Sequence, residues 1–118
     1  MVRHLATLTL LLGLLAVLPT AAQAAKCAPP KYPGSGEYTS LKVTHLSCAD
    51  GTKVVKSFYT CRTKTGPSGR CVKKVRGYAC RETRSITTET EFTGKATCTN
   101  GKRQVVIGYR QTITPARS

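Results

Sequence analysis

His45 is the only histidine after the first 24 residues, and any acid–base chemistry has to start from it. A hydrolase needs a base beside its nucleophile, and a ribonuclease needs a base and an acid flanking a phosphate. By residue type alone, His45 with Glu89 or Glu91 can supply the base and acid of a ribonuclease. However, His45 stands where a predicted strand meets a predicted helix, and its spacing gives it no partner. We therefore expect no enzyme, with a ribonuclease as an alternative.

Carboxylates are too scarce for two other kinds of chemistry. The chain has only 5 Asp and Glu residues, and Asp50 is assigned below to a helix cap. Glycosidases need two positioned carboxyl groups, and calcium sites need several oxygen ligands. The cysteines include no C-x2-C pair of the kind that holds zinc. We expect neither a metal nor a cofactor.

The strongest feature is an excess of positive charge, with 19 Lys and Arg residues and a formal net charge of +14. Such a surface attracts polyanions, although it can also serve solubility alone. We predict that an anionic polymer binds the clustered basic residues. These are Arg62, Lys64, Arg70, Lys73, Lys74, Arg76, Arg81, Arg84, Lys102 and Arg103. An antimicrobial protein is a further alternative, although the chain has no Trp and no basic amphipathic helix with an exposed apolar side.

The segment Thr63-Lys64-Thr65-Gly66-Pro67 resembles the inhibitory loop of Bowman–Birk trypsin inhibitors, a disulfide-closed T-K-S-x-P segment. The resemblance implies that Lys64 enters the specificity pocket of a trypsin-like protease and that Thr65 follows the scissile bond. A serine-protease inhibitor is therefore the main alternative function. The same residues also suit a helix end, because Gly66 accepts a left-handed conformation and Pro67 stops the helix.

Residues 1–24 have the pattern of a secretion signal. Arg3 supplies the positive start, Leu5–Leu18 is apolar, and Ala22-Gln23-Ala24 is an A-x-A cleavage site. We expect a secreted protein, or one in the periplasm or on the outside of the cell envelope. No later segment is apolar enough to span a membrane. The anionic partner is then an extracellular polymer or a cell-wall component.

All six cysteines follow this signal, and an even number in an exported small domain indicates three disulfides. Cys61 and Cys71 flank a short loop between a predicted helix and a predicted strand, so we expect them to pair. Three pairings remain open for Cys27, Cys48, Cys80 and Cys98. A bridge from helix to sheet favours Cys48 with Cys80, which leaves Cys27 with Cys98.

The first half of the domain is predicted to hold an arm, a strand and a helix. Residues 25–37 are rich in Pro and Gly and read as irregular. Residues 38–46 are typical of a strand. Ser47 and Asp50 then form a capping box for a helix over 48–65, which presents one apolar side.

Asn100-Gly101 between two alternating runs is the clearest turn signal. A two-residue hairpin at this point pairs Thr99 with Lys102. The same register places Glu91 opposite Arg110, which is a favourable cross-strand ion pair.

A further strand is predicted over 71–82, with Gly77 at a bulge. The order of elements is then β-α-β-β-β, an α+β domain in which one helix covers a four-stranded antiparallel sheet. Residues 38–118 form one such domain, stapled by disulfides and expected to be a monomer.

The runs SCADGTKVVKSFYTC, GRC, VRGYACRE and ATCTNGK resemble a class of small exported bacterial domains. That class has a Cys at the helix start, a strand with the pattern G-aromatic-x-C, and a Cys just before a terminal hairpin. The similarity covers about residues 38–110. It implies this fold and secretion, and it implies no catalytic residues.

Overall fold

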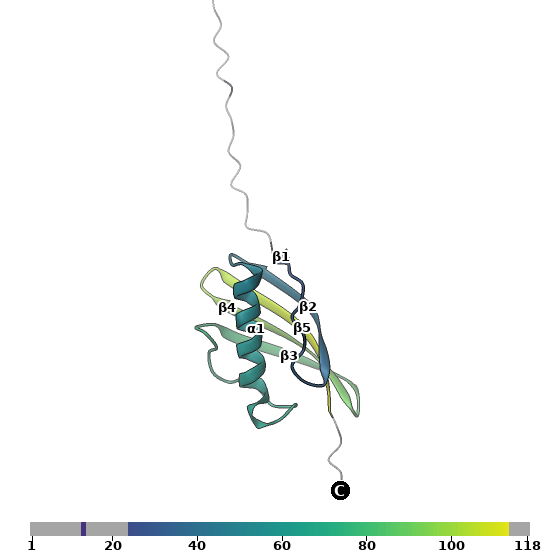
Figure 1. The fold of residues 1–118 in the computed structure, drawn as a ribbon. Coiled ribbons are helices and arrows are strands. Elements are labelled where there is room, and N and C mark those ends of the chain that lie inside the picture. Colours follow the sequence, from purple (N-terminus) through teal and green to yellow (C-terminus); the bar gives the residue numbers. More distant parts are fainter. Residues whose placement is uncertain (1–12, 14–23, 114–118) are drawn as a thin grey trace, which may run out of the picture.

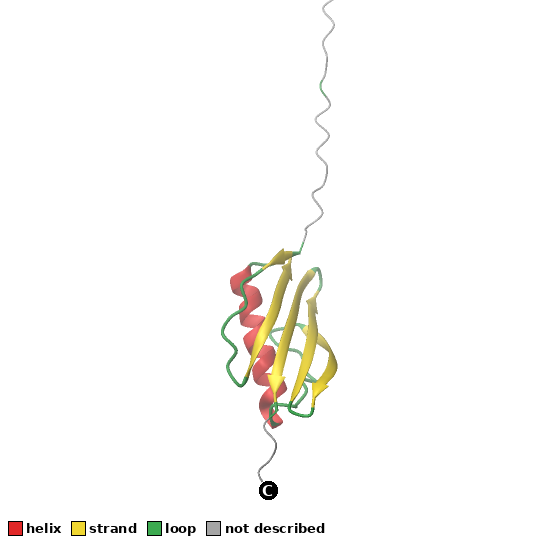
Figure 2. Ribbon diagram, turned by 90° about the vertical axis from the view of Figure 1, so that its right-hand side faces the viewer, coloured by secondary structure: helices red, strands yellow, loops and turns green. Residues whose placement is uncertain are grey.

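A computed structural model describes Gly13 and residues 24–113, so the predicted signal lies almost wholly outside the described residues. One helix packs on one face of a five-stranded antiparallel sheet (Figures 1 and 2). The elements in chain order are β1 (Ala25–Lys26), β2 (Gly36–Thr44), α1 (Cys48–Arg62), the 3-10 turn η1 (Thr63–Thr65), β3 (Ala79–Thr88), β4 (Glu91–Asn100) and β5 (Arg103–Thr112). The strands lie in the order β1-β2-β5-β4-β3. No helix within the described residues is long and apolar enough to cross a membrane.

The predicted α+β class is confirmed, and the sheet has one strand more than the predicted four. Part of the arm forms β1, which pairs with Lys42 and Val43 of β2. The amide of Cys27 continues this pairing by donating to the carbonyl of Leu41 at 2.9 Å. The Pro and Gly residues that suggested an irregular arm lie after this short strand.

Helix α1 begins as predicted and ends three residues early. The Ser47 hydroxyl accepts a hydrogen bond from the Asp50 amide at 3.1 Å, which caps the first turn. The chain tightens into η1 after Arg62, and Gly66 follows with a φ of 124°. The helix buries Val54, Val55 and Phe58 against the sheet.

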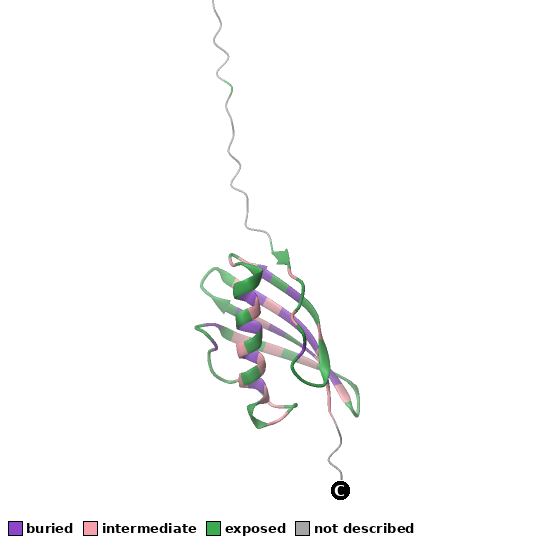
Figure 3. Ribbon diagram, viewed as in Figure 1, coloured by how far each residue is buried: buried purple, intermediate pink, exposed green. Residues whose placement is uncertain are grey.

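The core fills the space between α1 and the sheet (Figure 3). Its strand residues alternate along β4 and β5, and the sheet face turned away from α1 is mostly polar. The buried apolar residues are Tyr32, Leu41, Val43, Val54, Val55, Phe58, Val75, Tyr78, Phe92, Ala96, Cys98, Val105, Ile107 and Tyr109.

The terminal hairpin forms, but its predicted register is wrong. The turn is centred on Gly101 and Lys102, so Asn100 pairs with Arg103. Gly101 takes the left-handed φ of 59° that such a turn needs. The shift moves each partner by two residues, which leaves every side chain on its predicted face. Arg110 still reaches Glu91 diagonally, at 3.4 Å.

The strand predicted over 71–82 starts later, because residues 71–78 form a loop that lies against the core. Val75 and Tyr78 pair with each other across a tight turn, and both side chains are buried. Arg76 and Gly77 within this turn have positive φ values of 50° and 83°. Gly77 therefore serves a turn and not the predicted bulge.

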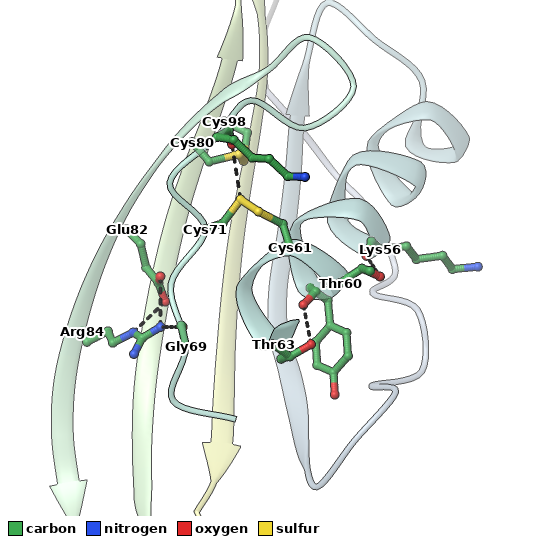
Figure 4. Close-up of a disulfide and its surroundings, with 12 residues drawn as sticks. Lys56, Thr60, Cys61, Thr63, Gly69, Cys71, Cys80, Glu82, Arg84 and Cys98 are labelled. Carbon is green, nitrogen blue, oxygen red and sulfur yellow. Dashed lines mark hydrogen bonds and ion pairs between the residues drawn. A yellow bond between two sulfur atoms is a disulfide. The ribbon is translucent and has the colours of Figure 1, made fainter. Parts of the chain in front are cut away.

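The three disulfides join Cys27 to Cys48, Cys61 to Cys71, and Cys80 to Cys98. The predicted pairing of Cys61 with Cys71 is confirmed, and it ties the helix end to the loop (Figure 4). The preferred pairing of the other four is wrong. Cys80 lies directly opposite Cys98 in the β3–β4 register, and β1 brings Cys27 beside the end of β2 that leads to Cys48.

Replacing Cys61 and Cys71 together by Ala is expected to lower the melting temperature by roughly 10–20 °C. The bridge closes a loop whose ends are 10 residues apart, and on the chain-entropy model that contributes about 3 kcal/mol. Thermal unfolding followed by circular dichroism measures the change. Val72→Ala is the control, since Val72 lies in the same loop and is 96% exposed. A double variant as stable as the parent would contradict the expectation.

Candidate functional site, a basic seam between the helix and the 71–78 loop

Arg62, the last residue of α1, is buried, with 1% of its surface exposed. Its guanidinium donates to the Pro67 carbonyl at 2.6 Å, the Tyr32 hydroxyl at 2.8 Å and Gln111 Oε1 at 2.9 Å. It also lies over the Tyr109 ring, with 4.4 Å between the guanidinium carbon and the ring centroid. The prediction that Arg62 binds an anionic polymer is therefore wrong, because its guanidinium is buried. The several N–H groups of one guanidinium thus bind three separate segments at the end of the helix: the loop at Pro67, the arm at Tyr32 and β5 at Gln111.

A largely buried pair, Glu82 and Arg84, continues this network toward β3. Glu82 accepts hydrogen bonds from the Tyr109 hydroxyl and from Arg84, the latter at 2.9 Å. Arg84 also donates to the backbone carbonyls of Ser68, at 2.7 Å, and of Gly69 (Figure 4). Only 12% of the Arg84 side chain is exposed, so its place in the predicted binding surface is also wrong. Both arginines instead hold the 61–71 loop in place.

Burial also shifts the acid–base behaviour of this region. It raises the pKa of the Tyr32 hydroxyl to about 12, although the neighbouring Arg62 works in the opposite direction. Burial likewise raises the pKa of Tyr38 and lowers the pKa of Arg62. Both tyrosines therefore stay neutral at ordinary pH.

A groove of about 410 Å³ runs between α1 and the 71–78 loop. Lys56 and Lys64 line it from the helix side, and Lys73 and Lys74 line it from the loop. Its remaining lining is Ser57, Thr60, Cys61 and Val75, so no carboxylate faces these four ammonium groups. The groove is thus positive on both walls.

A second hollow of about 230 Å³ lies farther along the same helix. Lys53, Arg76 and Arg103 line it, together with Asp50. Asp50 lies 3.9 Å from Lys53, and both side chains are mostly exposed, so this ion pair is weak. We call the combined cations of the two hollows the basic seam: Lys53, Lys56, Lys64, Lys73, Lys74, Arg76 and Arg103.

The ten predicted binding residues divide into three groups. Five lie in the basic seam: Lys64, Lys73, Lys74, Arg76 and Arg103. Arg62 is buried and Arg84 is largely buried, as described above. The others are exposed elsewhere: Arg70 beside the β3–β4 turn, Arg81 on the uncovered sheet face, and Lys102 in the terminal turn.

Sequence reasoning missed Lys53 and Lys56 as binding residues. Lys53, Lys56, Thr60 and Lys64 recur at spacings of three and four residues, which places them on one stripe of a helix. This stripe is roughly 16 Å long at 1.5 Å per residue. Helical spacing was therefore the signal for these two lysines.

The residues of the ribonuclease alternative lie far apart. His45 follows Thr44, which pairs with Gln104, whereas Glu91 pairs with Thr112 at the other end of β5. Eight residues of strand separate these positions, roughly 27 Å. Glu91 is also engaged by Arg110. Within residues 24–113, moreover, no three His, Cys, Asp or Glu side chains gather to hold a metal ion.

Lys64 of the inhibitor alternative is exposed and lies in η1, inside the 61–71 disulfide loop. Its backbone is therefore helical. A peptide that pairs with another protein as an added strand has to be extended. The helical backbone at Lys64 therefore does not suit this mode of binding.

Comparison with protein-family models, with curated proteins and with solved structures gives no match to this chain. The function has to be argued from the geometry and charge of the basic seam.

Arg62→Met is expected to lower the free energy of unfolding by about 3–5 kcal/mol. Methionine fills similar space but leaves the Pro67 carbonyl and the Tyr32 oxygen without the donor that Arg62 supplies. Gln111 Oε1 loses one of its two donors and keeps the bond from the Tyr32 hydroxyl. Urea unfolding measures the difference. The control, Arg81→Met, changes an exposed arginine on the uncovered sheet face and should cost less than about 0.5 kcal/mol. Equal stability of the two variants would show that the Arg62 network does not hold the fold.

Proposed function

We propose that this chain is a non-enzymatic extracellular protein that binds a linear polyanion along the basic seam. The observation that carries the proposal is the pair of facing cationic walls. Lysines of one helical stripe stand across a groove from Lys73 and Lys74, and no carboxylate lines that groove. A concave surface of one sign of charge concentrates the field and favours a partner of opposite charge.

The length of the seam favours a polymer over a small anion. Its helical wall extends roughly 16 Å, which is long enough for several successive charged groups of a chain. The lining contains no exposed aromatic side chain on which a base could stack. Most of its cations are lysines, which act as point charges and do not select a planar, bidentate partner. The seam therefore suits a backbone rich in phosphate or sulfate.

The fold holds the two walls together against their mutual repulsion. The disulfide from Cys61 to Cys71 joins them covalently, and Val75 and Tyr78 anchor the loop in the core. The charged groups therefore face each other before any ligand arrives, and little ordering is left to oppose binding. A bound polyanion relieves the repulsion, which adds to its affinity.

Three disulfides are typical of an oxidising compartment, which agrees with the predicted export. The signal over residues 1–24 and the secretion itself stay predictions.

The polyanion proposal is preferred to the inhibitor alternative because Lys64 lies in a helical turn. It is preferred to the ribonuclease alternative because His45 and Glu91 lie at opposite ends of the sheet. It is preferred to an antimicrobial role because α1 turns its apolar side into the core.

The test compares two variants that each lose four positive charges. The seam variant is K56Q/K64Q/K73Q/K74Q, and the control is R70Q/R81Q/K95Q/K102Q, whose residues are exposed outside the seam. Affinity for long-chain inorganic polyphosphate and for heparin is measured at salt concentrations from about 0.05 M to about 1 M. The two polymers separate phosphate from sulfate recognition.

A plot of log affinity against log salt concentration falls as salt rises. Its slope is expected to become shallower by roughly 3 in the seam variant and by less than about 1 in the control. Each cation that contacts the polymer releases counterions and contributes about one to this slope. If both variants lose the same amount, the net charge alone drives binding and the seam is not the site. Failure of the parent protein to bind either polymer would also overturn the proposal.

A further inference from the structure

A pair of lysines lies directly opposite each other at the edge of the sheet, away from the basic seam. Lys26 of β1 is the partner of Lys42 in β2, and both residues are exposed. Residues that face each other across an antiparallel pair have their side chains on the same face. The neighbours of Lys42 in β2, Leu41 and Val43, are buried under α1, so both lysines belong to the opposite, uncovered face.

This arrangement costs stability in the absence of a partner. Like charges directly opposite each other in a sheet repel. The two carboxylates of the uncovered face, Glu37 and Glu91, are both engaged by Arg110. Among the described residues, neither Lys26 nor Lys42 has a carboxylate within ion-pair distance. An anion bound between the two ammonium groups would remove the repulsion.

Two hydroxyl groups lie beside these lysines. The β2–β5 register slips by one residue between Tyr38 and Ser40, which leaves Thr39 as an extra residue. Thr39 Oγ1 and Ser40 Oγ each lie 2.6 Å from the point where a Cβ on Gly108 would stand, so both gather over the glycine. A hollow of about 330 Å³ is lined by these hydroxyl-bearing residues and by both lysines. Pro29, Cys27 and Leu41 complete the lining, and no carboxylate is among it.

We infer that Lys26, Lys42, Thr39 and Ser40 form a second anion site, for a phosphate or sulfate group of the same class of polymer. Two ammonium groups and two hydroxyl donors match the several oxygens of such a group. The two lysines belong to the sheet face that α1 leaves uncovered, whereas the basic seam runs along α1. Figure 2 shows that α1 covers one face of the sheet only. One molecule can therefore hold two polymer chains, one on each side, and bridge them. The bridging rests on the proposed function of the seam.

The experiment uses beads coated with long-chain inorganic polyphosphate and measures both bound protein and clumping of the beads. The face variant is K26Q/K42Q, and its control is K31Q/K102Q, which removes two exposed charges from neither site. The parent protein and the control are expected to bind and to clump the beads. The face variant and the K56Q/K64Q/K73Q/K74Q variant are each expected to bind, because one site remains, and to leave the beads dispersed.

The outcomes separate the second site from the seam. Clumping by the face variant at the parent's level overturns the second site, because a single site or a dimer then accounts for the bridging. A parent that binds without clumping overturns the second site and leaves the seam intact. Clumping by the seam variant at the parent's level overturns the proposed function of the seam instead. Absence of any binding by the parent overturns both.

Discussion

One buried guanidinium ties together the parts of this domain that carry its basic surface. Arg62 ends the helix and donates to the arm through Tyr32, to β5 through Gln111, and to the disulfide loop through Pro67. A buried arginine needs all of these acceptors, because an unpaired charge away from water is strongly destabilising. The end of α1 therefore has one position relative to the 61–71 loop. The Cys61–Cys71 disulfide then ties the helix to the start of the 71–78 loop, which forms the second wall of the basic seam.

The distribution of charge is the second constraint on this protein. Carboxylates are few, and most of them are used inside the fold or in local ion pairs: Glu82 with Arg84, and Glu37 and Glu91 with Arg110. Among the described residues, the four lysines of the larger groove and the Lys26–Lys42 pair have no carboxylate within ion-pair distance. Two separate anion sites on opposite faces would make the molecule bivalent, and its hold on a dense polymer would then exceed that of either site alone.

The sequence predicted what depends on local patterns, and it failed where distant segments meet. The Ser47 cap, the apolar helix face and the hairpin near Gly101 are local, and all three are present. Of the two bonds of the predicted capping box, the structure has the one from the Asp50 amide to the Ser47 hydroxyl. The hairpin register missed by two residues, since Gly101 stands first in the turn and not second. Arg62 was misread because burial of a helix-end arginine depends on Tyr32 and Gln111, 30 residues before it and 49 after it. The pairing of β1 with β2 brings Cys27 to Cys48, and a strand of two residues is too short to show a recognisable sequence pattern.

We propose that the folded arrangement of the cations, and not their number, selects the partner. Backbone amide shifts of the disulfide-bonded protein, titrated with inorganic polyphosphate, test it most directly. The largest changes are expected along the helical stripe from Lys53 to Lys64, in the facing loop residues 71–76, and around the second site at Lys26 and residues 39–42. Changes spread evenly over all exposed cations, with Arg70, Arg81 and Lys102 moving as much as the seam, would contradict it.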